Sequence, residues 1–168
     1  VLAHVPDIND FVGGFAAWLK PQGVATFEFP HLLRMIEGLQ FDTAYHEHYS
    51  YLSLTTVQRV FESNGLSVFD VEQLPTHGGS LRVFAQRRDS GLARRSPQVD
   101  AVLAEEASAG VSTLQFYESL QRQAERIKDE LLAFLISAKR EGHRVCAYGA
   151  AAKGNTLLNF AGVRPDLI

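Results

Sequence analysis

Residues 41–51 concentrate side chains that could move a proton. They include two histidines, two acids and three tyrosines within eleven positions, a mixture that suits the packing of neither a helix nor a strand. Histidine exchanges a proton near neutral pH, and a flanking carboxylate fixes its tautomer or raises its basicity. A tyrosine hydroxyl can hydrogen-bond a developing oxyanion. We therefore predict that Tyr45, His46, Glu47 and His48 form an acid–base site.

Two other interpretations of this cluster stay open at the level of sequence. The histidines could cap helices or satisfy buried carbonyls, as buried polar groups usually do. They could also bind a metal, because His46 and His48 are two residues apart and would point to one side of an extended segment. His31 and His77 are candidate further ligands, but a catalytic zinc site usually has three placed protein ligands and the sequence fixes no third one.

A second candidate site lies at residues 76–82. Gly78 and Gly79 allow a sharp backbone turn and a close approach to a ligand. His77, Ser80 and Arg82 offer polar contacts beside that turn. The predicted role is substrate binding, and the alternative is a plain hairpin turn.

A third candidate site lies at residues 149–156, between a strand predicted at 144–148 and a helix predicted at 156–161. Small residues and a lysine at a helix amino terminus suit an anion such as a phosphate, which makes Gly149, Lys153 and Asn155 candidates for substrate binding. The segment has neither the Walker spacing nor the third glycine of the dinucleotide fingerprint. If this segment were the only functional one, the chain would be a non-catalytic nucleotide-binding α/β module; a tight strand–helix turn is the structural alternative.

Apolar periodicity and turn residues predict the elements that position these segments. Helices are predicted at residues 7–19, 32–37 and 55–64, the last with a capping box formed by Thr55 and Gln58. Strands are predicted at residues 24–29, 66–74 and 80–86, and residues 1–5 have the composition of the end of a buried strand. The alternation indicates an α/β sheet whose closing strand pair is antiparallel.

The second half of the chain differs in kind from the first. Residues 87–97 are polar and carry four arginines, which predicts a linker. An apolar stripe from Leu114 to Ala138 predicts one long helix with a solvated charged face, ended by Gly142. We therefore expect a first unit at residues 1–88, a linker at 89–97 and the beginning of a second unit at 98–168.

The overall composition excludes several classes of protein. The chain has 168 residues, 46% of them hydrophobic and 21% charged, and its net charge of −3 leaves no basic footprint for nucleic acid. No apolar run reaches the roughly 20 residues of a membrane span. A single cysteine, Cys146, allows no internal disulfide and fits a cytoplasmic protein. The first residue is Val1 and no signal peptide follows, so the sequence is expected to be a piece of a longer protein.

Residues 41–51, 75–82 and 148–159, in this order, resemble the S-adenosylmethionine (SAM)-dependent C-methyltransferases that act on nucleotide-linked keto-deoxysugars. The resemblance implies that residues 1–88 are the second half of a Rossmann-like methyltransferase sheet. It also implies that a long helix and the start of a carboxy-terminal α/β substrate-binding domain follow. In that family a base removes a proton beside a keto group, and the resulting enolate takes the methyl group of SAM.

The resemblance also assigns roles to the candidate residues. It implies that His48 is the base, with Tyr45 and Glu47 around the sugar. It further implies that the substrate is contacted by His46, His77, Gly78, Gly79 and Ser80. The residues implied to lie near the nucleotide diphosphate are Gly149, Lys153 and Asn155.

The sequence lacks three features that the resemblance leads one to expect. The glycine-rich SAM loop, the acidic residue that holds the ribose and the cysteine-rich zinc module do not occur in it. Zinc is therefore expected only in an amino-terminal module outside this sequence. Of the cofactor site, only Ala3 and His4 could remain, so this chain alone is expected to bind SAM weakly or not at all.

Overall fold

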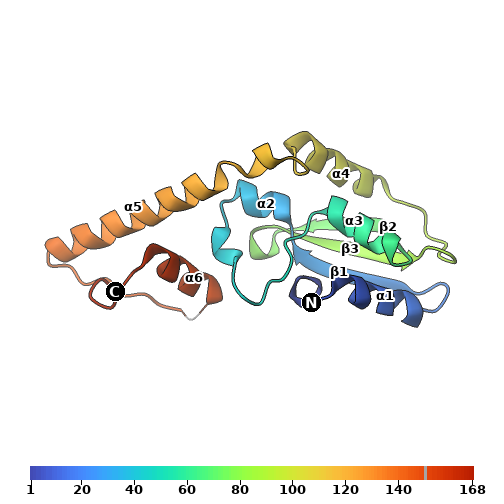
Figure 1. Cartoon of the computed structure of the whole chain (residues 1–168), viewed down its shortest axis with the longest axis horizontal. Helices are drawn as coiled ribbons and strands as arrows, with labels where there is room; N and C mark the ends of the chain where they lie inside the picture. The colour runs from blue at the N-terminus through green and yellow to red at the C-terminus, as the bar shows by residue number, and fades with distance from the viewer. Residues whose placement is uncertain (150) are drawn as a thin grey trace.

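The computed structural model of the chain is built around one three-stranded sheet (Figure 1). The structure describes residues 1–149 and 151–168. The strands are β1 (Val24–Pro30), β2 (Leu66–Leu74) and β3 (Ser80–Arg87), in the spatial order β1-β3-β2. Both outer strands are antiparallel to β3, so they run parallel to one another. The predicted mixed α/β fold and the antiparallel closing pair are confirmed.

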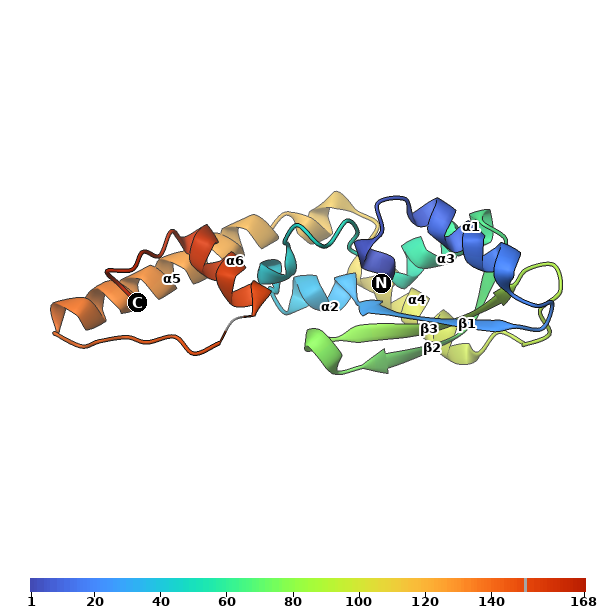
Figure 2. The ribbon, with the colours of Figure 1, turned by 90° about the horizontal axis from the view of Figure 1, so that it is seen from below.

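One face of the sheet forms the core. Burial alternates along β1, where Ala25, Phe27 and Phe29 are buried and the residues between them are exposed. Side chains that point to one face of a sheet recur every second residue, so this alternation defines the inner face. Helices α1 (Ile8–Trp18) and α3 (Leu54–Ser63) lie on that side of the sheet (Figure 2). The ring of Phe27 packs against Phe15 and Phe61 at centroid distances of 4.8 and 4.9 Å.

The N-cap of helix α3 lies two residues before its predicted position. Ser53 is the N-cap, and its side chain accepts a hydrogen bond from the amide of Thr56 at 3.1 Å. The predicted capping box of Thr55 and Gln58 is wrong, because the Thr55 hydroxyl donates instead to Glu106 at 2.6 Å. The predicted end is confirmed: Asn64 caps the helix and Gly65 follows with φ of 82°.

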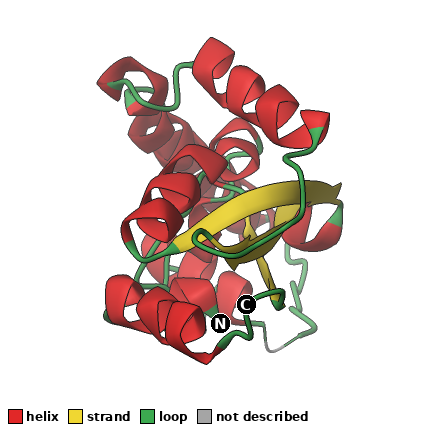
Figure 3. Ribbon diagram, turned by 90° about the vertical axis from the view of Figure 1, so that its right-hand side faces the viewer, coloured by secondary structure: helices red, strands yellow, loops and turns green. Residues whose placement is uncertain are grey.

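Two predicted strands are not strands. Residues Leu2–His4 form a 3-10 turn, and residues 143–149 are irregular, with a fully exposed Tyr148. In the described part of the chain β1, β2 and β3 are the only strands (Figure 3). A strand needs a partner for its backbone groups, and neither segment finds one there.

The carboxy-terminal half consists of helices. Helix α4 (Pro97–Ala109) begins where the predicted linker ends, and α5 (Leu120–Arg140) extends away from the sheet (Figure 1). The predicted long helix therefore starts later than Leu114, which lies exposed in the 3-10 turn Leu114–Tyr117. Helix α6 (Ala152–Ala161) begins before its predicted start and packs against α5. No helix among the described residues combines the length and the apolar character needed to cross a membrane.

The position of the α3 cap leads to a first prediction. Replacing Ser53 by Ala removes the side-chain acceptor for the Thr56 amide and should lower the free energy of unfolding by about 1 kcal/mol. Gln58→Ala is the matched control, because among the described residues the Gln58 amide bonds Glu62 and Arg95 only, at the exposed surface, and it should change stability by less than about 0.5 kcal/mol. Urea unfolding of both variants measures the difference, and equal effects would contradict the cap assignment.

Candidate active site

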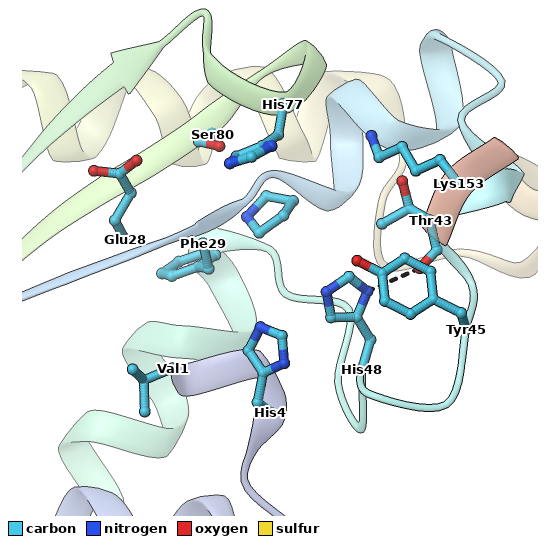
Figure 4. A pocket seen from close by; sticks show the side chains of 11 residues that line it. Val1, His4, Glu28, Phe29, Thr43, Tyr45, His48, His77, Ser80 and Lys153 are labelled. Carbon is cyan, nitrogen blue, oxygen red and sulfur yellow. Dashed lines mark hydrogen bonds between the residues drawn. The ribbon is translucent and has the colours of Figure 1, made fainter. Parts of the chain in front are cut away.

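A cavity of about 260 Å³ lies at the carboxyl end of β1 (Figure 4). Segments far apart in the sequence contribute its walls. Its lining residues are Val1, His4, Glu28, Phe29, Pro30, Thr43, Tyr45, His48, His77, Ser80 and Lys153. The three sequence segments predicted to hold chemistry therefore meet at one place.

Among the described residues, the His48 ring is held by a hydrogen bond to one of its two nitrogens. Its Nδ1 atom lies 2.8 Å from the backbone carbonyl oxygen of Thr43. A carbonyl oxygen only accepts hydrogen bonds, so this contact requires that Nδ1 carries the hydrogen. The Nε2 atom of the neutral ring then keeps its lone pair, which is the form that a general base needs.

Aromatic neighbours fix the plane of the His48 ring. The ring lies between those of His4 and Tyr45, at centroid distances of 4.8 and 4.4 Å (Figure 4). Burial, and secondarily the neighbouring Tyr45, raises the pKa of the Tyr51 phenol above its usual value of 10.0. Tyr51 therefore remains a neutral hydrogen-bond donor at neutral pH beside His48, with ring centroids 6.0 Å apart.

One short turn decides which side chains around His48 face the cavity. The amide of His48 donates to Tyr45 O at 3.0 Å. In a turn closed by such an i to i+3 bond, the two central residues lie at the corner. Here they are His46 and Glu47, and both are exposed and lie off the cavity wall.

The paired glycines approach the protein rather than the cavity. A Cβ atom on Gly78 would lie 2.2 Å from the Gln40 side-chain nitrogen, and one on Gly79 would lie 2.7 Å from Arg34 Cβ. Both glycines have positive φ, and neither lines the cavity. They shape a turn that presents His77, itself left-handed with φ of 54°, and Ser80 to the cavity.

Packing of α6 brings Lys153 to the cavity from the other end of the sequence. The ring of Phe160 packs on that of Phe41 at a centroid distance of 5.0 Å, at the start of residues 41–51 (the histidine segment). Gly149 and Asn155 are exposed and lie off the cavity wall. The predicted anion loop also includes Ala150, which lies outside the described residues.

Sequence reasoning missed two cavity residues. Glu28 accepts hydrogen bonds from Arg82 at 2.9 Å and from the Thr76 hydroxyl at 3.4 Å. The two-residue period of β1 was the available signal, because it places Glu28 on the face opposite Phe27 and Phe29. Thr43 is 3% exposed, and its hydroxyl has no hydrogen-bond partner among the described residues.

A buried hydrogen-bond partner explains His31. Its Nε2 atom lies 2.8 Å from Glu106 Oε1, and both side chains are 1% exposed. His31 is therefore engaged with Glu106 rather than with His46 or His48. In the described part of the chain, no three His, Cys, Asp or Glu side chains are grouped to hold a metal. Glu106 was also missed, although a charged residue in register with Val99 and Val102 on one helix face is a recognisable signal.

Residues 75–168 match the family model described as the C-methyltransferase C-terminal domain, and residues 1–71 match a methyltransferase domain. The chain belongs to the C-methyltransferase family. It is 38% identical over 161 residues, or 96% of its length, to the C-methyltransferase NovU of Streptomyces niveus. The chain spans 38% of the length of that relative. The family resemblance of the sequence motifs is thereby confirmed.

The described residues do not fit a SAM site. The carbonyl oxygen of Ala3 already accepts hydrogen bonds from the amides of Tyr49 and Ser50, and Ala3 is buried off the cavity. His4 alone of the two predicted cofactor residues lines the cavity. No glycine-rich turn among the described residues leads directly from a strand into a helix.

The Glu106 carboxylate leads to a second prediction. Burial raises the pKa of Glu106, but hydrogen bonds from His31, Thr55 and Leu54 outweigh burial and hold it below the usual 4.5. A depressed pKa in the folded state stabilises the fold above the usual pKa, and this stabilisation is lost as pH falls through the folded-state value.

Replacing Glu106 by Gln should therefore flatten the acid limb of the stability profile. The variant should be less stable than the wild type at pH 7, and the difference should shrink below pH of about 4 as the wild-type carboxylate takes up its proton. Thermal unfolding measured from pH 7 to pH 3 provides the comparison. A difference that is constant over this range would contradict the depressed pKa.

Proposed function

We propose that this chain forms the acceptor-binding and proton-removing part of a SAM-dependent C-methyltransferase. The acceptor is a nucleotide-linked keto-deoxysugar, and the proton removed is on the carbon next to the keto group. The observation that carries the proposal is the hydrogen bond from His48 Nδ1 to the Thr43 carbonyl, which leaves Nε2 as a base in the cavity wall. Membership of the C-methyltransferase family supports it.

The chemistry follows from the groups in the cavity. A keto group acidifies the neighbouring C–H bond, and His48 Nε2 accepts that proton while the electron pair moves onto the keto oxygen. The Tyr45 hydroxyl lines the same cavity and is placed to donate a hydrogen bond to this oxyanion. SAM would supply the methyl group that the resulting carbon nucleophile takes. We propose that residues outside this chain hold SAM, because the described residues do not fit it.

The rest of the cavity is suited to the remainder of the substrate. His77, Ser80 and Glu28 supply polar groups for sugar hydroxyls on the side opposite Lys153 (Figure 4). Lys153 supplies the positive charge that a nucleotide diphosphate requires. We assign no substrate contact to His46, Glu47, Gly149 or Asn155, since they lie off the cavity wall.

The proposed domain boundaries follow the sheet. Strand β3 pairs with both β1 and β2, so residues 1–88 form one unit although the carboxy-terminal family model matches from residue 75. Residues 89–97 connect this unit to the helices of residues 98–168. The cavity takes Lys153 from the second unit and the base from the first, so we propose that both units bind the substrate.

The base assignment is tested by proton exchange in the complete enzyme that carries this chain. Wild-type enzyme in deuterated water should exchange the proton beside the keto group of a nucleotide-linked 4-keto-6-deoxysugar for deuterium. Proton NMR measures the rate at which the signal of this proton is lost. His48→Gln removes the free ring nitrogen and should slow this exchange by at least about a hundredfold. His46→Gln is the matched control, two residues away and exposed, and should change it by less than about threefold. Unchanged exchange in His48→Gln would show that another group is the base.

The role of Lys153 is tested by measuring KM and kcat of a variant that lacks its charge. Lys153→Ala should raise KM for the nucleotide sugar about tenfold and leave kcat within about threefold, because the contact lies away from the reacting carbon. Lys139→Ala is the control, since Lys139 pairs with Asp166 outside the cavity. A fall in kcat without a change in KM would place Lys153 at the reaction centre instead.

A further inference from the structure

We propose that Glu106 is the positioning residue of the acceptor cavity. It lies on α4, in the part of the chain matched by the carboxy-terminal family model, and does not itself line the cavity. Through His31 and the start of α3 it holds the two segments that carry His48 and His77. The link to catalysis rests on the proposed function, whereas the effect on the geometry of His48 is independent of it.

Both carboxylate oxygens of Glu106 are fully used. Oε1 accepts from the amide of Leu54 at 2.6 Å and lies 2.8 Å from His31 Nε2. Oε2 accepts from the amide of Thr55 at 2.8 Å and from its hydroxyl at 2.6 Å. A carboxylate with 1% exposure is stable only when such donors replace water, so its position fixes theirs.

His31 connects Glu106 to the cavity floor and to the His77 turn. It directly follows Pro30, which lines the cavity. Its amide donates to the carbonyl of Gly79 at 3.0 Å, in the turn that presents His77 and Ser80. A shift of His31 would therefore move both Pro30 in the cavity wall and the turn that presents His77.

The start of α3 connects Glu106 to His48. Leu54 and Thr55 follow residues 41–51, the segment that carries His48. Their contacts with Glu106 therefore fix the carboxyl end of that segment. The same end is tied to the His31 region, because the amide of Leu32 donates to Leu52 O at 3.0 Å. Without the carboxylate, two buried amides and the His31 ring would lose their acceptor, and the segment would have to shift to satisfy them.

The neighbouring Glu105 offers a control that distinguishes the positioning of His48 from the attachment of α4 to the rest of the fold. Its carboxylate pairs with Arg34 of α2 (Leu32–Glu37) and accepts from Gln73 of β2, at the partly exposed edge of α4. None of its hydrogen bonds among the described residues goes to His31 or to α3. Removing Glu105 thus weakens the attachment of α4 and leaves the Glu106 contacts in place.

The experiment compares Glu106→Gln with Glu105→Gln in the 168-residue chain. Long-range proton–nitrogen NMR of labelled histidine reports the tautomer of His48. Wild type and Glu105→Gln should show a single tautomer with hydrogen on Nδ1. Glu106→Gln, with far-UV circular dichroism unchanged, should show a mixture of tautomers or a broadened His48 signal. A folded Glu106→Gln chain with the wild-type His48 signals would overturn the proposal.

A milder variant covers the case in which Glu106→Gln does not fold. Thr55→Val removes only the hydroxyl donor to Oε2 and keeps both backbone bonds. It should shift the His48 signals from those of the wild type toward a mixture of tautomers, and His48 signals identical to those of the wild type would overturn the proposal.

The kinetic consequence is measured in the complete enzyme. Glu106→Gln should lower kcat by about a hundredfold with KM within about threefold, since a base displaced by about 1 Å loses its alignment with the C–H bond. Glu105→Gln should stay within about twofold for both constants. If the tautomer shifts but wild-type enzyme exchanges no proton, the proposed function is wrong and the positioning role stands. If kcat falls without a change at His48, the positioning role is wrong.

Discussion

The buried Glu106 carboxylate ties together two segments that lead to the cavity. Removing a charged carboxylate from water is unfavourable unless hydrogen-bond donors surround it, and here they come from His31, Leu54 and Thr55. These donors belong to the end of β1 and to the start of α3, which are separated in sequence by the whole histidine segment. One side chain therefore sets the distance between the two ends of the loop that carries His48.

The elements predicted from the sequence are correct where local patterns decide them. The alternation in residues 24–29 and the apolar spacing in residues 7–19 give β1 and α1 at nearly the predicted bounds. Prediction fails where a distant partner decides. Residues 1–5 and 144–148 have the composition of strands but no partner strand among the described residues. Thr55 has the sequence of a capping box, but the Glu106 carboxylate, 51 residues away, takes its hydroxyl.

The candidate site shows the same division. The sequence indicates which segments carry chemistry, and the structure brings all three to one cavity. The sequence does not indicate which residues of the motif at 45–48 face the cavity, because that depends on the turn between Tyr45 and His48. His46 and Glu47 are as polar as their neighbours and occupy the outer corner of that turn. Thr43 matters to His48 through its backbone carbonyl, a contact that residue type does not encode.

The proposed base and the contacts that orient it lie within this chain, and they depend on α4 as well as on the sheet. The Thr43 carbonyl fixes the tautomer of His48, and Glu106 of α4 binds His31 and the start of α3. The same cavity takes Lys153 from α6, near the other end of the chain. The proposed acceptor site therefore depends on the sheet and on the carboxy-terminal helices together, because residues from both line one cavity.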